Sequence, residues 1–423
     1  MKNKSTLFAA QILILLSLNV FAQNPKCPNA VPITNDPAYN AIKASASLNY
    51  LPRYALDSIS AYCAWSITTG DPDILVAVID TEFDTTHEDM KNTFESIVGI
   101  RRHPESHGTG TSSLVASGTN NGKGMAGIGY NTRVRGYHAA DKCLSRDNDC
   151  VWNGVKSAYQ DGIKIISVSA SRLDGYEYDT YWNNLYLQQM LNDGVVLIVA
   201  AGNDSTSKEH QAYADIPGVI NVSSVNRNNL NRPTNNARNA WVDVCATSSH
   251  IVAAKRSDDT TAPKDPFCVG SAFTGWYCLG AAGPKVYTSQ AAPQVAGTVA
   301  LMRSVNSFLP SDSIEHIIKT TGDHILDDTL FKGRTSTNPP PRRVNAYKAV
   351  KEAKRRACGR TDTFSKLITK NTLNQSVNGG NIIISNTSIA SGKRLSVRAC
   401  NSVTINGPFL VEAGAALNIN VVP

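Results

Sequence analysis

The chain is organised around the stretch Tyr287-Thr288-Ser289-Gln290-Ala291-Ala292-Pro293-Gln294-Val295-Ala296-Gly297. Small and hydroxylated residues open it, and apolar residues then follow at helical spacing. Pro293 stands about one turn after Ser289, and proline is tolerated near a helix start but breaks a helix interior. The pattern therefore predicts that a helix begins close to Ser289.

A serine at a helix start has two explanations. Serine is a favoured N-cap residue, and capping accounts for Ser289 taken alone. The same position also sets a hydroxyl beside free backbone N–H groups and the positive end of the helix dipole. Those groups suit an oxyanion formed next to the hydroxyl. The stretch by itself favours the capping explanation of Ser289. The choice between the two explanations therefore depends on the rest of the chain.

The beginning of the chain has the features of an exported protein. Two lysines precede an apolar run over residues 7–21, and Val20 and Ala22 occupy the small-residue positions of a cleavage site. A membrane anchor is the alternative, but the run is shorter than the roughly 20 apolar residues that span a bilayer. We predict a signal peptide over residues 1–22 and a protein that is secreted or held at the cell surface, with no membrane span after cleavage.

The composition limits the domain organisation and the classes of partner that the chain can have. The chain has 423 residues, of which 42% are apolar and 18% charged, and this suits one large globular domain plus a smaller one. The net charge of +7 includes the signal-peptide lysines, and the densest basic cluster is only Lys354-Arg355-Arg356. We therefore do not expect nucleic acid as a partner.

Nine cysteines in an exported chain indicate disulfides plus one leftover thiol. Cys245 lies in an apolar segment and is the expected buried thiol. A zinc site is the rival interpretation, but the chain contains no Cys-x-x-Cys pair. Connectivity stays open, and the pairs that suit the spacing are Cys27/Cys63, Cys143/Cys150, Cys268/Cys278 and Cys358/Cys400.

Aliphatic runs recur along the chain and predict a parallel sheet. Residues 74–79 are all apolar, as in a strand buried on both faces. Helix-like segments separate the runs, and strand alternating with helix is typical of βαβ units. The other predicted strands are 132–139, 161–169, 194–203, 219–225 and 241–246. The predicted helices are 55–64, 151–160, 185–191, 311–318 and one beginning near 343–346; residues 226–286 otherwise look loop-rich.

Polar residues stand at the ends of these elements. Asp80 and Asn203 follow aliphatic runs, and in open α/β sheets ligands gather at the carboxyl ends of strands. Turn formation explains each of them equally well. His107 opens a helical pattern, and a lone histidine is usually structural. His103 precedes it at a zinc-like spacing, but Pro104 argues against one helix there, and we predict no metal ligands.

Composition changes beyond Cys358, where Asn, Ser and Gly become frequent. Short alternating strands recur between glycines, over residues 382–385, 394–399, 402–406, 409–413 and 417–421. This pattern predicts a small all-β module over residues 358–423, either a β-solenoid or a β-sandwich.

Asp80, His107 and Ser289 together form the set that acyl transfer requires. A serine hydroxyl needs a base near neutral pH; histidine supplies it, and aspartate orients the histidine and stabilises its charged form. Asn203 would add an N–H donor for the developing oxyanion.

In this order, the residues resemble those of the subtilisin-like serine proteases (subtilases). The similar segments are residues 76–81 with His87 and Asp89, residues 107–109, residues 199–203, residues 288–297 and residues 343–346. The resemblance covers roughly residues 56–357 and implies a three-layer α/β/α domain with a mostly parallel sheet. It implies catalytic roles for Asp80, His107 and Ser289 and an oxyanion-hole role for Asn203. It also implies a substrate-lining strand at Ser169, Ala170 and Ser171.

Several positions depart from the family pattern. Glu82 and Tyr287 stand where glycines are usual, and Gln290 and Gln294 replace the common Met and His. Two hypotheses follow for Glu82, that it raises the pKa of His107 or that it closes part of the cleft. Tyr287 would narrow the substrate pocket or distort its loop. Only about fifty residues lie between Gln23 and Ile74, too few for the usual inhibitory prodomain plus a mature N-terminus, so the enzyme folds without one or residues 23–55 are a small substitute.

The resemblance implies polypeptide substrates, bound as an extra strand along residues 169–171, and no required cofactor. Subtilases often carry structural calcium, but no dense acidic loop marks its ligands here. The C-terminal module resembles appended β-domains of exported bacterial proteases, including some cargo of the type IX secretion system. We expect it to contact a surface, a substrate or the secretion machinery.

The sequence thus predicts a secreted serine endopeptidase. The alternative is a non-catalytic binding protein on a protease fold, with its site altered by Glu82 and Tyr287, although binding alone does not need the full set of residues. An esterase of the α/β-hydrolase type requires a Gly-x-Ser-x-Gly elbow with serine ahead of the aspartate and histidine. The order here is the reverse.

Overall fold

The computed structural model describes residue 27 and residues 34–37, 54–99, 106–139, 150–169, 180–203, 216–226, 241–248, 251–256, 276–279, 287–325 and 340–421. The predicted signal peptide, most of residues 23–55, and Cys143 and Cys268 lie outside these residues. Among the helices it describes, none is both long and apolar enough to cross a bilayer.

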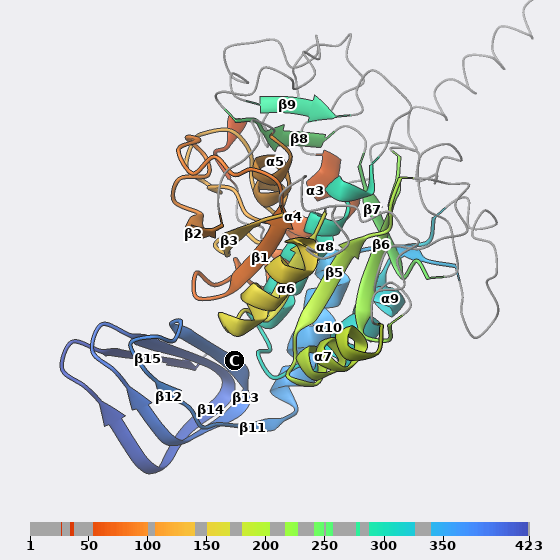
Figure 1. The fold of residues 1–423 in the computed structure, drawn as a ribbon. Helices are drawn as coiled ribbons and strands as arrows, with labels where there is room; N and C mark the ends of the chain where they lie inside the picture. Colours follow the sequence, from red (N-terminus) through yellow and green to blue (C-terminus); the bar gives the residue numbers. More distant parts are fainter. Residues whose placement is uncertain are drawn as a thin grey trace, which may run out of the picture.

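An eight-stranded parallel sheet forms the centre of the large domain (Figure 1). Its strand order is β10-β7-β6-β5-β4-β1-β3-β2, so the chain crosses over repeatedly. All side chains of β1, β4 and β5 are buried, as their mainly aliphatic sequences predict. The strands are β1 (Leu75–Asp80), β2 (Phe94–Val98), β3 (Arg133–His138), β4 (Ile165–Val168), β5 (Val196–Ala200), β6 (Val219–Val225), β7 (Val244–Thr247) and β10 (Arg342–Arg343).

Helices cover both faces of the sheet. Because side chains alternate along a strand, Val76 and Val78 of β1 point to one face and Ala77 and Ile79 to the other. The first face packs against α8 (Ala292–Arg303), α9 (Ser311–Thr321) and α10 (Ala346–Cys358), and the second against α6 (Cys150–Gln160) and α7 (Thr180–Asn192). The three-layer α/β/α prediction is therefore confirmed.

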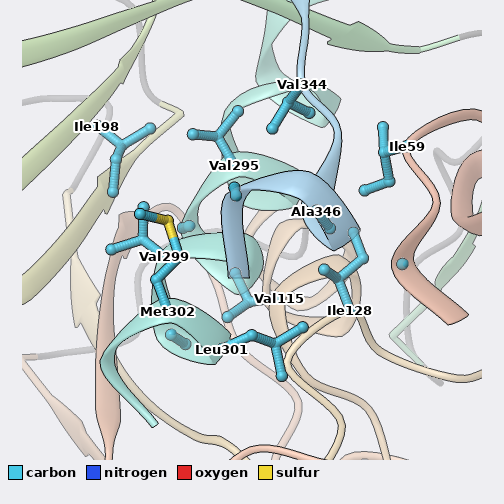
Figure 2. Close-up of a cluster of buried hydrophobic side chains, with 14 of the residues drawn as sticks. Ile59, Val115, Ile128, Ile198, Val295, Val299, Leu301, Met302, Val344 and Ala346 are labelled. Atoms are coloured by element: carbon cyan, nitrogen blue, oxygen red, sulfur yellow. The ribbon is translucent and has the colours of Figure 1, made fainter. Parts of the chain in front are cut away.

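The helix α8 is buried along its length and lies in the core of the first face. Figure 2 shows Val299 and Met302 of α8 beside Ile198 of β5, with Ala346 at the start of α10 nearby. This explains why the stretch around Ser289 organises the domain: the helix that follows it joins the sheet to α10.

Two predictions about local structure need correction. The single helix expected over residues 55–64 is two helices, α3 (Tyr54–Ser58) and α4 (Ala61–Ala64), because Ser60 between them has a left-handed backbone with φ of 56°. The loop-rich region also contains an antiparallel pair, β8 (Ile251–Ala254) and β9 (Trp276–Leu279). Tertiary pairing sets these short strands, and local sequence signals them poorly.

The C-terminal module stacks its strands in parallel. Gln375 pairs with Leu395, and Leu395 in turn pairs with Leu417 one coil further along. A sandwich is built from antiparallel sheets, so the module is a small solenoid. The predicted short strands are parts of longer bent ones, with irregular register near Gly379 and Ser385. The strands are β11 (Thr361–Phe364), β12 (Leu367–Ile368), β13 (Gln375–Ile389), β14 (Arg394–Val411) and β15 (Ala416–Val421).

Ion pairs fix the module against the large domain just before β1. Both carboxylate oxygens of Asp73 accept hydrogen bonds from the guanidinium of Arg394, with Nε at 3.0 Å from Oδ2. Asp71 lies 3.2 Å from Arg398 and accepts a hydrogen bond from the Ser376 hydroxyl. The two aspartate side chains are almost fully buried, so the junction is a tight one.

Two predicted disulfides form within the described residues. One joins Cys27 to Cys63, and the other joins Cys358 at the end of α10 to Cys400 of β14. Cys245 is a buried thiol in β7, as expected.

Candidate active site

Asp80 and His107 are brought together at the carboxyl edge of the sheet. Asp80 is the last residue of β1 and is fully buried, and His107 is the first residue of α5 (His107–Val115). The Nδ1 atom of His107 lies 2.6 Å from Oδ1 of Asp80, and about a third of the His107 side chain is exposed. The imidazole therefore has one nitrogen on a buried carboxylate and its other edge toward the surface.

Asp80 is held in its ionised form by hydrogen-bond donors. Burial alone would raise the pKa of Asp80, but the charge and hydrogen bond of His107 lower it below its ordinary value, with help from Thr81 and Thr111. The backbone N–H of Thr81 donates to Oδ1 at 2.7 Å, and the hydroxyl of Thr111 donates to Oδ2 at 2.8 Å. An ionised Asp80 accepts from Nδ1–H of His107, which leaves Nε2 of the neutral ring as a base.

Ser289 does not cap α8. It lies in the short 3₁₀ turn η3 (Thr288–Gln290), and the N-cap of α8 is Ala291, which has no side-chain capping bond. The hydroxyl of Ser289 donates to the carbonyl oxygen of Ser169 at 3.1 Å, and the Ser169 hydroxyl donates to the Ser289 carbonyl at 3.0 Å. The cap explanation is therefore wrong.

Ser289 and the Asp80–His107 pair lie at the same edge of the sheet, because Ser289 bonds to Ser169, which follows β4, the parallel neighbour of β1. The turn η3 also packs against α5. A hydroxyl has one hydrogen, and that of Ser289 is directed at Ser169. This hydrogen has to be redirected before Ser289 can donate to His107. Such rearrangement is common, since catalytic hydrogen bonds often tighten only when substrate binds.

Asn203 follows β5 and is tied to the turn that carries Ser289. Its amide oxygen accepts from the backbone N–H of Thr288 at 2.8 Å and from the Thr288 hydroxyl at 3.1 Å. The same hydroxyl accepts from the backbone N–H of Gly202. With the amide oxygen committed to Thr288, the Nδ2 donors of Asn203 point the other way.

One of the three predicted substrate-lining residues is placed at the site. Ser169 follows β4 and exchanges hydrogen bonds with Ser289, so the end of β4 lies beside the turn. Ala170 and Ser171 lie outside the described residues.

The structure bears on two of the departures from the family pattern, Glu82 and Tyr287. Glu82 is buried, and its carboxylate lies 3.6 Å from Arg256 and 3.9 Å from Nδ1 of His138. It is thus directed into the protein toward a cation, which supports neither hypothesis about Glu82. Tyr287 has φ −123° and ψ 134°, an extended backbone open to any residue. Its replacement of glycine therefore introduces no backbone strain.

Sequence reasoning missed Thr111. It lies one helical turn after His107 in α5, so the two side chains share the face that meets Asp80. The spacing was available in the sequence, but threonine inside a helix commonly bonds to its own backbone and drew no notice.

Calcium remains an untested expectation. No group of three or more His, Cys, Asp or Glu side chains in the described part of the chain is arranged to hold a metal. Asp36 and Asp89 are buried carboxylates near Asn121. They already accept hydrogen bonds from the backbone N–H groups of Asn120, Asn121 and Met125 and from the Asn121 side chain.

A model of the Subtilase family matches residues 71–339, well over half of the chain. The chain belongs to this family. Over 309 residues it is 28% identical to thermitase of Thermoactinomyces vulgaris, covering 70% of this subtilase and 95% of that protein. It is 29% identical to a thermophilic serine proteinase of Bacillus sp. (strain AK1), covering 68% of this subtilase and 64% of the relative.

Solved structures agree on the fold of this subtilase. A lanthipeptide protease matches with a TM-score of 0.54 at 18% identity, over 71% of this chain and 94% of the other. The maturation protease PagA of prenylagaramide matches with a TM-score of 0.53 at 22% identity, over 69% and 98%.

Proposed function

We propose that this subtilase is an exported serine endopeptidase with Ser289 as nucleophile, His107 as general base and Asp80 as the residue that orients His107. The observation that carries this proposal is the 2.6 Å bond between Asp80 and His107 beside the turn of Ser289. A buried, ionised aspartate on Nδ1 both fixes the ring and stabilises the imidazolium that forms when Nε2 takes a proton.

The reaction would proceed in two halves. The Ser289 oxygen attacks the peptide carbonyl carbon while its proton passes to Nε2 of His107, and the resulting oxyanion accepts hydrogen bonds from Asn203 and the Ser289 backbone N–H. His107 then gives the proton to the leaving amine, and the C–N bond breaks to leave an acyl-enzyme. Water, deprotonated by His107, releases the acid and restores Ser289.

The substrate class follows from the neighbouring strand. An extended peptide would lie along the segment after β4, where Ser169 meets the Ser289 turn. That geometry suits an unfolded or looped polypeptide.

Export is supported by the two disulfides in the described part of the chain, since such bonds persist in oxidising compartments. Relatives include proteins named as extracellular proteases, from Natrialba magadii and Dichelobacter nodosus. Sequencing the amino terminus of the exported protein tests the predicted cleavage after Ala22; retention of residues 1–22 would refute it.

We also propose that the solenoid contacts a surface or the secretion machinery. Its exposed large apolar side chains support this role, and they include Leu367, Ile405, Leu410 and Ile419. Export and cell attachment of a full-length Leu410→Ser/Ile419→Ser variant at wild-type levels would contradict it.

Digestion of casein and labelling by a fluorophosphonate probe test the catalytic proposal. The wild type should cleave casein and take up the probe, and Ser289→Ala should do neither. Ser391→Ala, an exposed serine of the module, is the matched control and should behave as wild type. Equal digestion by wild type and Ser289→Ala would refute Ser289 as the nucleophile, and no digestion and no labelling by the wild type would favour the non-catalytic alternative.

A further inference from the structure

The carboxylate of Asp80 has two oxygens, and different partners hold them. Oδ1 meets His107 at 2.6 Å, and Oδ2 accepts the Thr111 hydroxyl at 2.8 Å. Both Asp80 and Thr111 are buried, so water does not replace the hydroxyl. One helix, α5, therefore supplies the imidazole to one oxygen and the hydroxyl to the other.

We propose that Thr111 is a positioning residue for the Asp80–His107 pair, acting on catalysis through the second oxygen of Asp80. This inference rests on the proposed function of that pair. The terminal torsion of an aspartate side chain is broad and roughly two-fold, so donors on Oδ1 alone, which are His107 and the Thr81 N–H, fix the carboxylate plane less well than donors on both oxygens. A donor on Oδ2 stops the rotation that would move Oδ1 away from Nδ1.

Thr111 also moderates the basicity of the pair. A hydrogen bond to the charged form of a carboxylate stabilises it and makes it a weaker base. Without that bond, Asp80 draws more strongly on the proton of His107 and stabilises the imidazolium. His107 would then stay protonated to a higher pH.

A purely structural role is the competing explanation. The Thr111 hydroxyl is also 3.2 Å from the carbonyl oxygen of Gly108, the usual bond of a helical threonine to its own backbone. One hydrogen cannot serve both acceptors well, and the closer, charged acceptor is Asp80. The two explanations differ in what removal of the hydroxyl does to His107.

The first test uses steady-state kinetics on a chromogenic peptide. Thr111→Val keeps the shape and removes the donor, and we expect kcat to fall on the order of tenfold with KM unchanged, as for loss of a hydrogen bond to a charged group. The acidic limb of kcat/KM should move to higher pH by about half a unit. Thr111→Ser keeps the hydroxyl and should restore both values.

A double-mutant cycle with Asp80→Asn separates action through Asp80 from an effect on the fold. In the Asp80→Asn background, Thr111→Val should cost little more, because the carboxylate it acts on is gone. Three results would each overturn the proposal. These are equal losses of kcat in both backgrounds, a wild-type pH profile for Thr111→Val, and a failure of Thr111→Ser to restore the kinetic values. Thermal unfolding identifies a variant that does not fold, and Thr111→Ala then takes the place of Thr111→Val.

The NMR titration of His107 tests the proposal without turnover. In the Ser289→Ala protein, the midpoint of His107 should rise when Thr111→Val is added and return with Thr111→Ser. This readout survives failure of the peptidase proposal, which the casein comparison detects separately. An unchanged titration midpoint of His107 would refute the positioning role of Thr111 but not the peptidase proposal.

Discussion

The amide oxygen of Asn203 accepts hydrogen bonds from both the backbone N–H and the hydroxyl of Thr288, the residue before Ser289. These hydrogen bonds hold the segment after β5 against the turn η3. Because the oxygen is occupied, the orientation of the Nδ2 donors is set before any substrate arrives, which is the preorganisation that oxyanion stabilisation requires.

Replacing Asn203 should therefore affect the chemical step. We expect Asn203→Ala to lower kcat by about 10²–10³ with little change in KM, since in the proposed mechanism the donor acts on the oxyanion and not on the bound peptide. Asn203→Asp is the sharper variant, because it keeps an acceptor for Thr288 but removes the N–H donor. Steady-state kinetics in which Asn203→Asp retains most of the activity would show that the donor is not used.

Gly108 controls how closely α5 approaches β1. A Cβ atom there would lie 2.7 Å from the carbonyl oxygen of Glu82 and 3.2 Å from Cβ of Asp80. Gly108→Ala must push the helix start away, and a displacement of about 1 Å at the proposed catalytic pair would cost on the order of 10²-fold in rate. Gly359→Ala is the control, as its Cβ meets nothing within 4 Å. Full activity in both variants would show that the Asp80–His107 pair tolerates the shift.

Glu82 should contribute to stability through Arg256. Both side chains are 3% exposed, so removing the carboxylate leaves a buried guanidinium with less compensation. We expect Glu82→Gln to lower the free energy of unfolding by about 3 kcal/mol in urea denaturation. Glu88→Gln breaks an exposed pair with Lys123 and should cost less than about 1 kcal/mol. Similar losses for the two variants would contradict the buried-pair argument.

The stability of the protein should depend on the ionisation of Asp89. Burial, together with the nearby charges of Asp36 and Glu88, raises the pKa of Asp89 from 3.8 to about 7, against the hydrogen bonds from Met125 and Asn121. A carboxyl whose pKa is raised on folding stabilises the fold at low pH, and that contribution is lost as the pH rises from about 4 through 7.

Urea denaturation with a calcium chelator present measures this dependence. Between pH 5 and 8 the free energy of unfolding should fall for the wild type and fall less for Asp89→Asn. Some slope should remain, because burial also raises the pKa of Asp36. The exposed Asp312→Asn should keep the wild-type slope. If Asp89→Asn keeps it too, Asp89 does not titrate in this range.

Much of the fold could be predicted because local sequence patterns indicate its strands and helices. The runs that became β1 and β5 are aliphatic almost to their ends, and β4 is interrupted only by Ser167; a strand covered on both faces suits such runs. Asp80 and Asn203 could be proposed as site residues because each follows such a run. Their convergence could be expected, since parallel strands end at one edge.

What escaped prediction depends on contacts between distant segments. Glu82 is directed at Arg256, and Asp73 at Arg394, and no local pattern marks either partner. The helix break at Ser60 and the bends of β13 and β14 likewise depend on packing. Thr111 is a different case, because its spacing from His107 can be seen in the sequence, whereas its hydrogen bond to Asp80 cannot.

The disulfide between Cys27 and Cys63 has a consequence for maturation by proteolysis. A single cut anywhere between these residues opens the chain without releasing the piece before it, and a cut between Cys358 and Cys400 likewise leaves the solenoid attached. Nicked molecules would therefore migrate as one species until a thiol reductant is added. Self-digestion by a single cut in either interval would therefore nick the chain without releasing its beginning or its end.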